Sequence, residues 1–183
     1  MALIVVAEDD AGTRMLVASV LIRDGHEVLL AEDGTQGLAL VESRRPDLIL
    51  SDVQMPGLNG FDMLAAVRRN VMVAGTPAIL LTSLQDRVHM RIGMTSGADD
   101  YITKPFRPGE LREAVMAQLK KREMQARLQN MAVDAAVRTA LDTHTEQLAK
   151  LYERRLANAL SDRWPTEDGA AVDEKFAHAT VLF

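Results

Sequence analysis

PDLILSDVQMPGLNG, residues 46–60, joins a run of apolar residues to an acidic residue and a tight turn. The apolar run predicts a buried strand that ends at Asp52. Pro56 and Gly57 suit a tight turn after this aspartate. Gly60 has no side chain, so it lets the chain approach its neighbours closely before the next helix begins. The stretch therefore predicts a buried strand with a carboxylate at its end.

Strands and helices alternate on both sides of this stretch. Five strands alternating with five helices imply a parallel sheet covered on both faces. Right-handed crossovers make it a doubly wound, five-stranded α/β sheet, followed by a long C-terminal helical extension. The strands are expected at residues 2–7, 27–31, 46–52, 77–83 and 99–103. The helices are expected at residues 34–43, 60–69, 86–97 and 108–122, and before Gly25, where Met15, Leu16, Val20 and Leu21 form the expected core face.

The composition is that of a globular protein without a strong charge. Apolar residues make up 48% of the 183 residues, enough for one domain and a smaller appendage, and the net charge is −5. Acidic residues outnumber basic ones before and after Lys121, so neither part has the basic surplus of a nucleic-acid or anionic-membrane binder. There is no cysteine, and no apolar run approaches the roughly 20 residues of a membrane span. We therefore expect a cytoplasmic protein with no nucleic-acid partner and no membrane partner.

Acidic, hydroxyl and basic side chains stand at the carboxyl ends of the predicted strands. Ligands of a doubly wound sheet bind at this edge, near the switch in strand order. Taken singly, such residues have ordinary roles as helix caps or solvated groups. At the corresponding ends of separate strands, they together indicate one site. The set is Glu8, Asp9, Asp10, Asp52, Thr82 and Lys104.

The chemistry of this set suits phosphoryl transfer with a divalent cation. Carboxylates that converge repel one another and favour a hard cation with oxygen ligands, such as Mg²⁺. A carboxylate beside the cation can act as a nucleophile. The ammonium group of Lys104 can pair with one phosphoryl oxygen, and the hydroxyl of Thr82 can donate a hydrogen bond to another.

Four motifs resemble those of the receiver domain of two-component response regulators, over about residues 1–121. VVAEDDAGTR resembles the acidic-pair motif, and SDVQMPGLNG resembles the phosphoacceptor loop. LLTS resembles the motif of the switch hydroxyl, and GADDYITKPF the motif with the switch aromatic and the lysine. The resemblance implies the flavodoxin-like receiver fold. It also implies a phosphoryl group taken from a sensor histidine kinase or a phosphotransfer protein.

The resemblance implies a role for each matching residue of the acidic site. Asp52 would be the phosphorylated aspartate. Asp9 would bind Mg²⁺ directly and Glu8 through water, and the backbone carbonyl of Gln54 would supply a further ligand. Asp10 is the weaker ligand candidate.

The same resemblance implies a conformational switch. Thr82 would move toward the phosphoryl group and Tyr101 would rotate inward behind it, while Lys104 would bridge the phosphate and the carboxylate. Pro105 allows a cis peptide bond after Lys104. Ser83 stands where the family often has a small apolar residue, a departure that bears on the rate of dephosphorylation.

Residues 122–163 are predicted to continue the last helix. This segment has no glycine or proline and is rich in helix formers. Leu141 and Leu148 lie seven positions apart, but Arg155 falls where the next core residue would lie, so the heptad register is imperfect. We expect a parallel dimeric coiled coil, and the alternative is a helix folded back on its own domain. The apolar positions are Met124, Leu128, Met131, Val137, Leu141, Leu148, Leu151, Leu156 and Leu160.

Residues 164–183 are predicted to form a polar connector and one orphan strand. DEKFAHATVLF resembles the start of class III adenylate and guanylate cyclase domains, whose catalytic residues would lie beyond Phe183. This implies that the chain is not itself a cyclase and that its phosphorylation controls an output domain through the helical linker. Diguanylate cyclases and protein phosphatases are other candidate outputs. A stand-alone phosphorelay or adaptor protein, whose helical tail binds a partner, is an alternative of a different class.

Overall fold

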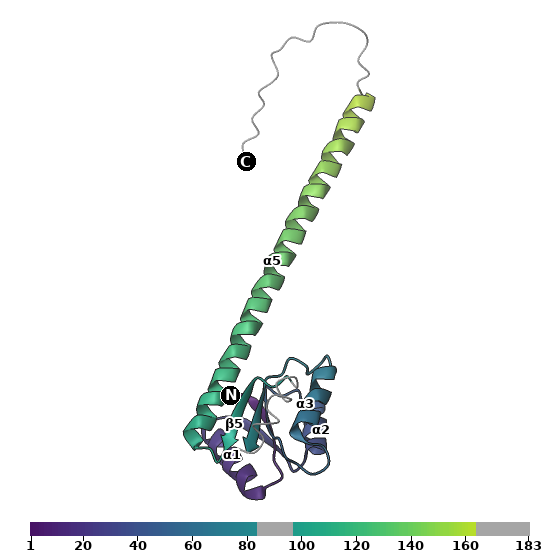
Figure 1. Ribbon diagram of the computed structural model, residues 1–183. Coiled ribbons are helices and arrows are strands. Elements are labelled where there is room, and N and C mark those ends of the chain that lie inside the picture. Colours follow the sequence, from purple (N-terminus) through teal and green to yellow (C-terminus); the bar gives the residue numbers. More distant parts are fainter. Residues whose placement is uncertain (84–96, 164–183) are drawn as a thin grey trace. The chain divides into compact units, whose positions relative to one another are not determined.

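A computed structural model describes residues 1–83 and 97–163 (Figure 1). The strands are β1 (Leu3–Ala7), β2 (Glu27–Ala31), β3 (Leu48–Asp52), β4 (Ala78–Ser83) and β5 (Asp100–Lys104). The helices are α1 (Ala11–Arg23), α2 (Gly34–Arg44), α3 (Gly60–Arg69) and α5 (Pro108–Arg163). The strands form one parallel sheet in the order β2-β1-β3-β4-β5. The predicted five-stranded α/β sheet and the long final helix are confirmed.

The sheet separates two apolar layers, because successive residues of a strand point to opposite faces. Val5 and Ala7 pack in the layer that α2 and α3 cover. Ile4 and Val6 pack in the layer that α1 and α5 cover. Figure 1 shows these two pairs of helices on opposite sides of the strands. Burial on both faces explains why β1, β3 and β4 are apolar runs rather than alternating patterns.

A side-chain cap starts each of the first three helices. The backbone N–H groups of Thr13, Gln36 and Asp62 donate hydrogen bonds of 2.7, 2.8 and 2.8 Å to the side chains of Asp10, Asp33 and Asn59. Each cap satisfies a backbone donor that the first turn of the helix leaves free. The caps follow β1, β2 and β3, so they help to fix the loops at the carboxyl edge of the sheet.

The core face of α1 differs from the prediction. Val20 and Leu21 are buried as expected, but Met15 and Leu16 are exposed, and Val17 and Ala18 take their place in the core. This helix carries apolar residues around most of its circumference. The spacing of its apolar residues therefore does not single out one face, and contact with the sheet selects it.

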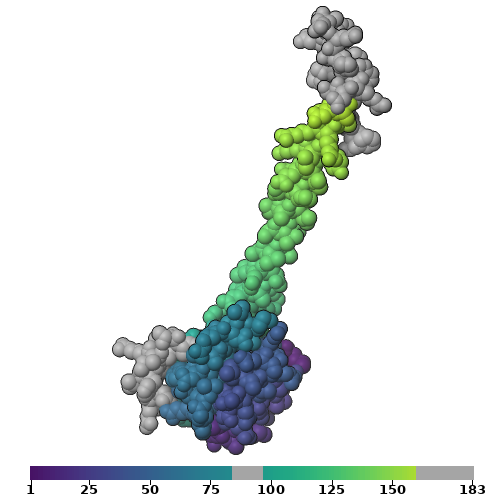
Figure 2. Space-filling view, turned by 90° about the vertical axis from the view of Figure 1, so that its right-hand side faces the viewer, coloured from purple at the N-terminus to yellow at the C-terminus, as the bar shows by residue number. Residues whose placement is uncertain are grey.

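α5 ends at Arg163, the residue at which the long helix is expected to end. The chain divides into two compact units, Met1–Gln129 and Asn130–Phe183. In the first unit, Leu111 and Val115 of α5 are buried in the core. In the second, the side chains of residues 130–159 are exposed (Figure 2). Within the described parts of the chain, no helix is both long and apolar enough to span a bilayer.

Some predictions concern residues that the structure does not describe. The helix expected at residues 86–97 falls in the undescribed range 84–96, apart from Gly97. The connector and orphan strand of residues 164–183, with the resemblance to a cyclase domain, also lie outside the described residues.

Candidate functional site

Most of the predicted site residues meet at the carboxyl edge of the sheet. The strand ends are aligned there, because Ala7 of β1 pairs with Ser51 of β3, and Ser83 of β4 pairs with Lys104 of β5. One pocket at this edge is lined by Glu8, Asp9, Asp10, Asp52, Gln54, Ser83 and Lys104. The parallel topology therefore gathers residues from four separate parts of the sequence into one pocket.

Lys104 joins two carboxylates in this pocket. Its Nζ donates a hydrogen bond of 2.6 Å to Oε2 of Glu8 and lies 2.8 Å from Oδ2 of Asp52. The side chain of Glu8 is fully buried, that of Asp52 is 10% exposed and that of Lys104 is 24% exposed. Buried charges are tolerated when they are paired and hydrogen-bonded. One ammonium group therefore compensates two carboxylates, and an excess negative charge is left when both are ionised.

Burial and pairing shift the ionisation of these groups. Burial raises the pKa of Glu8 above its ordinary value; the hydrogen bond from Lys104 opposes this rise, and the charge of Asp52 adds to it. For Lys104, burial penalises the ammonium, but hydrogen bonds to Asp52 and Glu8 outweigh that penalty and raise its pKa. The lysine is therefore charged at neutral pH.

Asp9 and Asp10 are adjacent in sequence but are placed differently. One carboxylate oxygen of Asp9 lies within 4.8 Å of carboxylate oxygens of Glu8 and Asp52. The carboxylate of Asp10 instead caps α1 through the N–H of Thr13, and hydrogen bonding to Thr13 lowers its pKa. Because its carboxylate caps the helix, Asp10 is a weaker candidate for a metal ligand than Asp9.

The three clustered carboxylates fit the coordination chemistry of Mg²⁺. This cation takes oxygen ligands, binds through one or two carboxylates and keeps several waters. Asp9 is exposed, and Asp52 is largely buried but lines the pocket, whereas the Glu8 side chain is fully buried against Lys104, so Asp9 and Asp52 are the better placed direct ligands. Gln54 lines the same pocket, and its N–H lies 3.4 Å from Oδ1 of Asp52.

The loop after Asp52 is held closely from two sides. A Cβ atom on Gly60 would lie 2.1 Å from the backbone oxygen of Asp52, and one on Gly34 would lie 2.1 Å from the backbone oxygen of Leu58. Gly57 has a φ of +75°, which glycine adopts without steric cost. The close approach predicted at Gly60 is present. Gly34 has no comparable signal in the sequence, because its neighbour belongs to a different loop.

The predicted switch residues do not line the acidic pocket. Thr82 is buried, and its hydroxyl donates a hydrogen bond of 3.1 Å to the backbone oxygen of Ser83. Tyr101 is partly buried and packs against the apolar layer on the side of α2 and α3. Ser83, in contrast, lines the pocket directly. The peptide bond between Lys104 and Pro105 is cis.

Arg14 of α1 is a residue of the site that the sequence does not single out. Its guanidinium donates hydrogen bonds to the backbone oxygens of Glu8 and Asp9, at 2.7 and 3.2 Å. It also pairs with Glu32 after β2. Its position four residues after the α1 cap is the signal that could have placed it beside this loop.

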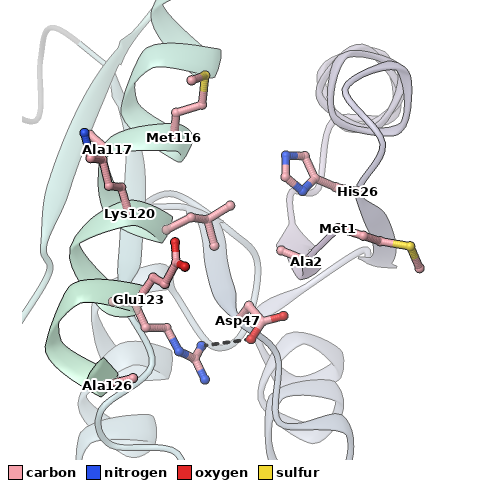
Figure 3. Close-up of a pocket in the computed structure, with 11 residues that line it drawn as sticks. Met1, Ala2, His26, Asp47, Met116, Ala117, Lys120, Glu123 and Ala126 are labelled. Atoms are coloured by element: carbon pink, nitrogen blue, oxygen red, sulfur yellow. Dashed lines mark ion pairs between the residues drawn. The ribbon is translucent and has the colours of Figure 1, made fainter. Parts of the chain in front are cut away.

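A second pocket lies at the opposite, amino-terminal edge of the sheet (Figure 3). Ala2 and Asp47 line it next to the starts of β1 and β3, and one side belongs to α5. Arg122 pairs with Asp47 across 3.6 Å. The pocket is larger than the acidic one, and its lining combines apolar residues with two acidic and two basic residues, Asp47, Glu123, Lys120 and Arg122. Within the described parts of the chain, the acidic group placed to hold a metal ion lies at the carboxyl edge, which makes that edge the functional candidate.

Comparison with known proteins identifies relatives over the same residues. A family model described as the response regulator receiver domain matches residues 4–116. The chain is 41% identical over 120 residues to the DNA-binding response regulator MtrA of Mycolicibacterium paratuberculosis, a match that covers 66% of this chain and 52% of MtrA. It is 34% identical over 160 residues to the transcriptional regulatory protein AfsQ1 of Streptomyces coelicolor, which covers 85% of this chain and 70% of AfsQ1.

A solved structure agrees with the sequence relatives. The receiver domain of the Francisella response regulator 1452 has a TM-score of 0.61 and 31% sequence identity, over 66% of this chain and 98% of that domain. The chain spans about half the length of the first curated relatives that it matches.

These relatives correct one expectation drawn from charge. MtrA is named as DNA-binding, and AfsQ1 is named as a transcriptional regulator, so the expectation of no nucleic-acid partner is wrong. The net charge of the matched region does not report on the partner of the whole protein, because the match covers only part of each relative. Neither name is that of a cyclase. Sequence and fold agree over the same residues, and the chain belongs to the family of response regulator receiver domains.

Proposed function

We propose that this two-component response regulator accepts a phosphoryl group on Asp52 in a Mg²⁺-dependent reaction, from a sensor histidine kinase or a phosphotransfer protein. The observation that carries the proposal is the position of Lys104, within 2.8 Å of Asp52 and 2.6 Å of Glu8, beside the exposed carboxylate of Asp9. A cation, a nucleophile and two further carboxylates are thus gathered at one edge of the sheet. This set suits the transfer of an anionic group to a carboxylate.

The proposed reaction forms an acyl phosphate. A carboxylate oxygen of Asp52 attacks the phosphorus atom, and the bond between phosphorus and the donor's imidazole nitrogen breaks. The leaving nitrogen keeps the electron pair of that bond and takes a proton from water, so the donor departs as a neutral imidazole. Lys104 remains charged and pairs with both the carboxylate and the incoming oxygens.

Magnesium would be held by Asp9 and Asp52, by the backbone carbonyl of Gln54, and by Glu8 through water. When bound, Mg²⁺ supplies positive charge against the oxygens of the transferring group. Glu8 keeps Lys104 in place through their hydrogen bond, and Asp9 offers its exposed carboxylate to the cation.

The proposed switch begins at Thr82. Its hydroxyl donates to the oxygen of Ser83 in this structure, and after phosphorylation it would donate to a phosphoryl oxygen instead. Tyr101 would then rotate inward behind it. A change of hydrogen-bond partner at one buried hydroxyl is a small local change. Packed helices and strands amplify it, because they have discrete arrangements between which they switch.

We further propose that the segment of α5 after Gln129 carries the signal onward as a dimer. Residues 130–159 are exposed, although Val137, Leu141 and Leu148 lie on one face of the helix. A solitary helix gains little stability without an apolar partner, and a second copy offers one. The alternative is an adaptor whose helix binds a different protein. A transcriptional output, as named for MtrA and AfsQ1, is one that this segment could control.

The phosphoacceptor is tested by chemical labelling. A small-molecule phosphodonor with Mg²⁺ should add one phosphoryl group to the full chain, and mass spectrometry should locate it on Asp52. The Asp52→Asn variant should stay unlabelled, while Asp62→Asn, changed on the exposed part of α3, should be labelled like the wild type. Equal labelling of Asp52→Asn and the wild type would place the acceptor at another residue.

A further inference from the structure

Arg14 is a mostly buried arginine beside the acidic pocket. Its side chain is 12% exposed, although it belongs to the first turns of α1. A guanidinium removed from water needs acceptors for its donors, or its burial destabilises the fold. The partners of Arg14 therefore indicate what the buried cation does.

Two of its acceptors are backbone oxygens of the acidic loop. Nη1 donates to the carbonyl of Glu8 at 2.7 Å and to the carbonyl of Asp9 at 3.2 Å. Nη2 donates to Oε1 of Glu32 at 3.0 Å, and Glu32 is 69% exposed. One nitrogen thus bridges two successive peptide groups, and the other reaches the loop after β2.

Together with two further hydrogen bonds, these bonds fix the backbone of the acidic loop, residues 8–10. The N–H of Glu8 donates to the oxygen of Ala31 at 3.1 Å, and the side chain of Asp10 is held by the N–H of Thr13. With the carbonyls of Glu8 and Asp9 bound to Arg14, the backbone is held before, along and after Asp9. The direction in which the Asp9 side chain leaves the backbone is then set by the guanidinium.

We propose that Arg14 is a positioning residue for Mg²⁺: by bridging the carbonyls of Glu8 and Asp9, it holds the carboxylate of Asp9 in the pocket shared with Asp52. This inference rests on the proposed metal site. Arg14 acts through hydrogen bonds rather than through charge alone. Nη1 of its guanidinium binds both carbonyls while Nη2 is held by Glu32, and a lysine ammonium, which has a single nitrogen, lacks the second point of attachment.

The test measures Mg²⁺ binding to the full chain by titration calorimetry, with far-UV circular dichroism to show that each variant is folded. Arg14→Gln should raise the dissociation constant about tenfold, as loss of a partner that orients a metal ligand commonly does. Arg14→Lys keeps the charge and should remain several-fold weaker than the wild type. Glu32→Gln removes the exposed ion pair but leaves both carbonyl bonds, and should stay within about twofold.

A kinetic readout separates positioning from a general loss of structure. In phosphorylation by a small-molecule donor, Arg14→Gln should raise the Mg²⁺ concentration that gives half the maximal rate, and leave the maximal rate nearly unchanged. Wild-type affinity in Arg14→Gln, or full affinity in Arg14→Lys, overturns the role of Arg14 while the metal site stands. If Arg14→Gln does not fold, the Arg14→Lys affinity decides alone. A wild type that binds no Mg²⁺ overturns the metal site itself, and the role of Arg14 with it.

Discussion

At the scale of single residues, the site depends on two neighbouring aspartates with different partners. Asp9 shares the pocket with Asp52, whereas Asp10 caps α1 through the N–H of Thr13. The two residues are neighbours in the chain, but Asp10 caps the helix that begins at Ala11, whereas Asp9 lies before the cap. Substitutions at these two positions should therefore change different properties of the protein.

Metal affinity should depend on Asp9 and not on Asp10. Asp9→Asn removes a proposed ligand and should weaken Mg²⁺ binding by at least tenfold, more than the loss of a partner that only orients a ligand. Asp10→Asn keeps the side-chain oxygen that caps α1 and should bind Mg²⁺ nearly as well as the wild type. Titration calorimetry on the two variants checks this. A greater loss in Asp10→Asn than in Asp9→Asn would reverse the assignment of the ligand.

The cap at Asp10 should also make stability depend on pH in the acid range. Hydrogen bonding to Thr13 lowers the pKa of Asp10, so the folded state favours the carboxylate more than the unfolded state does. The resulting stabilisation is present above the unfolded pKa, near 3.8, and is lost as the pH falls through the folded pKa.

Asp10→Asn should therefore lose less stability than the wild type between neutral pH and about pH 2, because its cap does not titrate. Urea unfolding at both pH values measures the difference. Asp33→Asn, which changes the corresponding cap of α2, tests whether the effect is specific to α1. Identical pH profiles for Asp10→Asn and the wild type would contradict the role of the cap.

The same residues show how much of this site can be predicted from the sequence. Glu8, Asp9, Asp52 and Lys104 could be placed together, because parallel strands bring their carboxyl ends to one edge. For Arg14 the sequence offers only its position four residues after the α1 cap, and for Gly34 it offers no signal, because the loop that Gly34 contacts lies elsewhere in the sequence. Hydrogen-bond donors and close contacts of this kind leave no periodic pattern.

At the scale of elements, α2 and the loop after β3 are in unusually close contact. Gly34 is the first residue of α2 and lies against the carbonyl of Leu58. Gly37 follows one turn later, and a Cβ atom there would lie 2.9 Å from Cβ of Ala7. α2 therefore packs on both the loop after β3 and β1 without room for added side chains. The position of Asp52 is coupled to this packing through the loop.

Gly34→Ala should destabilise the protein by about 1–3 kcal/mol, because the added methyl group meets backbone rather than a flexible side chain. Gly109→Ala is the matched control: it also lies in the first turn of a helix, but nothing is within 4 Å of its Cβ position. It should be neutral or stabilise by up to about 1 kcal/mol. Chemical denaturation of the two variants measures these effects. Equal stability for both would show that the loop moves aside without cost.

The elements themselves were predicted with different success, for physical reasons. β1, β3 and β4 are buried on both faces, so their apolar runs mark them within a residue or two. The face of α1 was misassigned, because Met15 and Leu16 are as apolar as the residues that are buried. When a helix is apolar on all sides, its sequence does not indicate which side will pack against the sheet.

At the scale of the whole molecule, α5 runs through both compact units, and its surroundings differ between them. Leu111 and Val115 of its first turns are buried in the core of the first unit, and the described side chains from Glu123 onward are exposed. Val137, Leu141, Leu148 and Tyr152 lie on one side of the second part, while Thr143, Glu146 and Lys150 lie on the other. Such an amphipathic surface favours association.

The full chain should therefore be a dimer in solution, at least when phosphorylated, and a chain ending at Gln129 should be largely monomeric. Light scattering measures both masses. Leu141→Glu with Leu148→Glu should shift the full chain toward the monomer, because it places charges on the apolar side. Thr143→Glu, on the polar side, should leave the mass unchanged. A monomeric full chain in the phosphorylated state would favour a helix that binds another protein.

The position of Lys104 on the last strand has a consequence for the order of assembly. Polypeptides are synthesised from the amino terminus, and parts of a domain can begin to associate as they emerge. β1, β2, β3 and β4 precede β5, so Glu8 and Asp52 are made before Lys104, the ammonium partner of both. The acidic residues of the nascent sheet therefore repel one another until β5 covers the edge of β4. The step that closes the sheet therefore also brings in the ammonium group that pairs with Glu8 and Asp52.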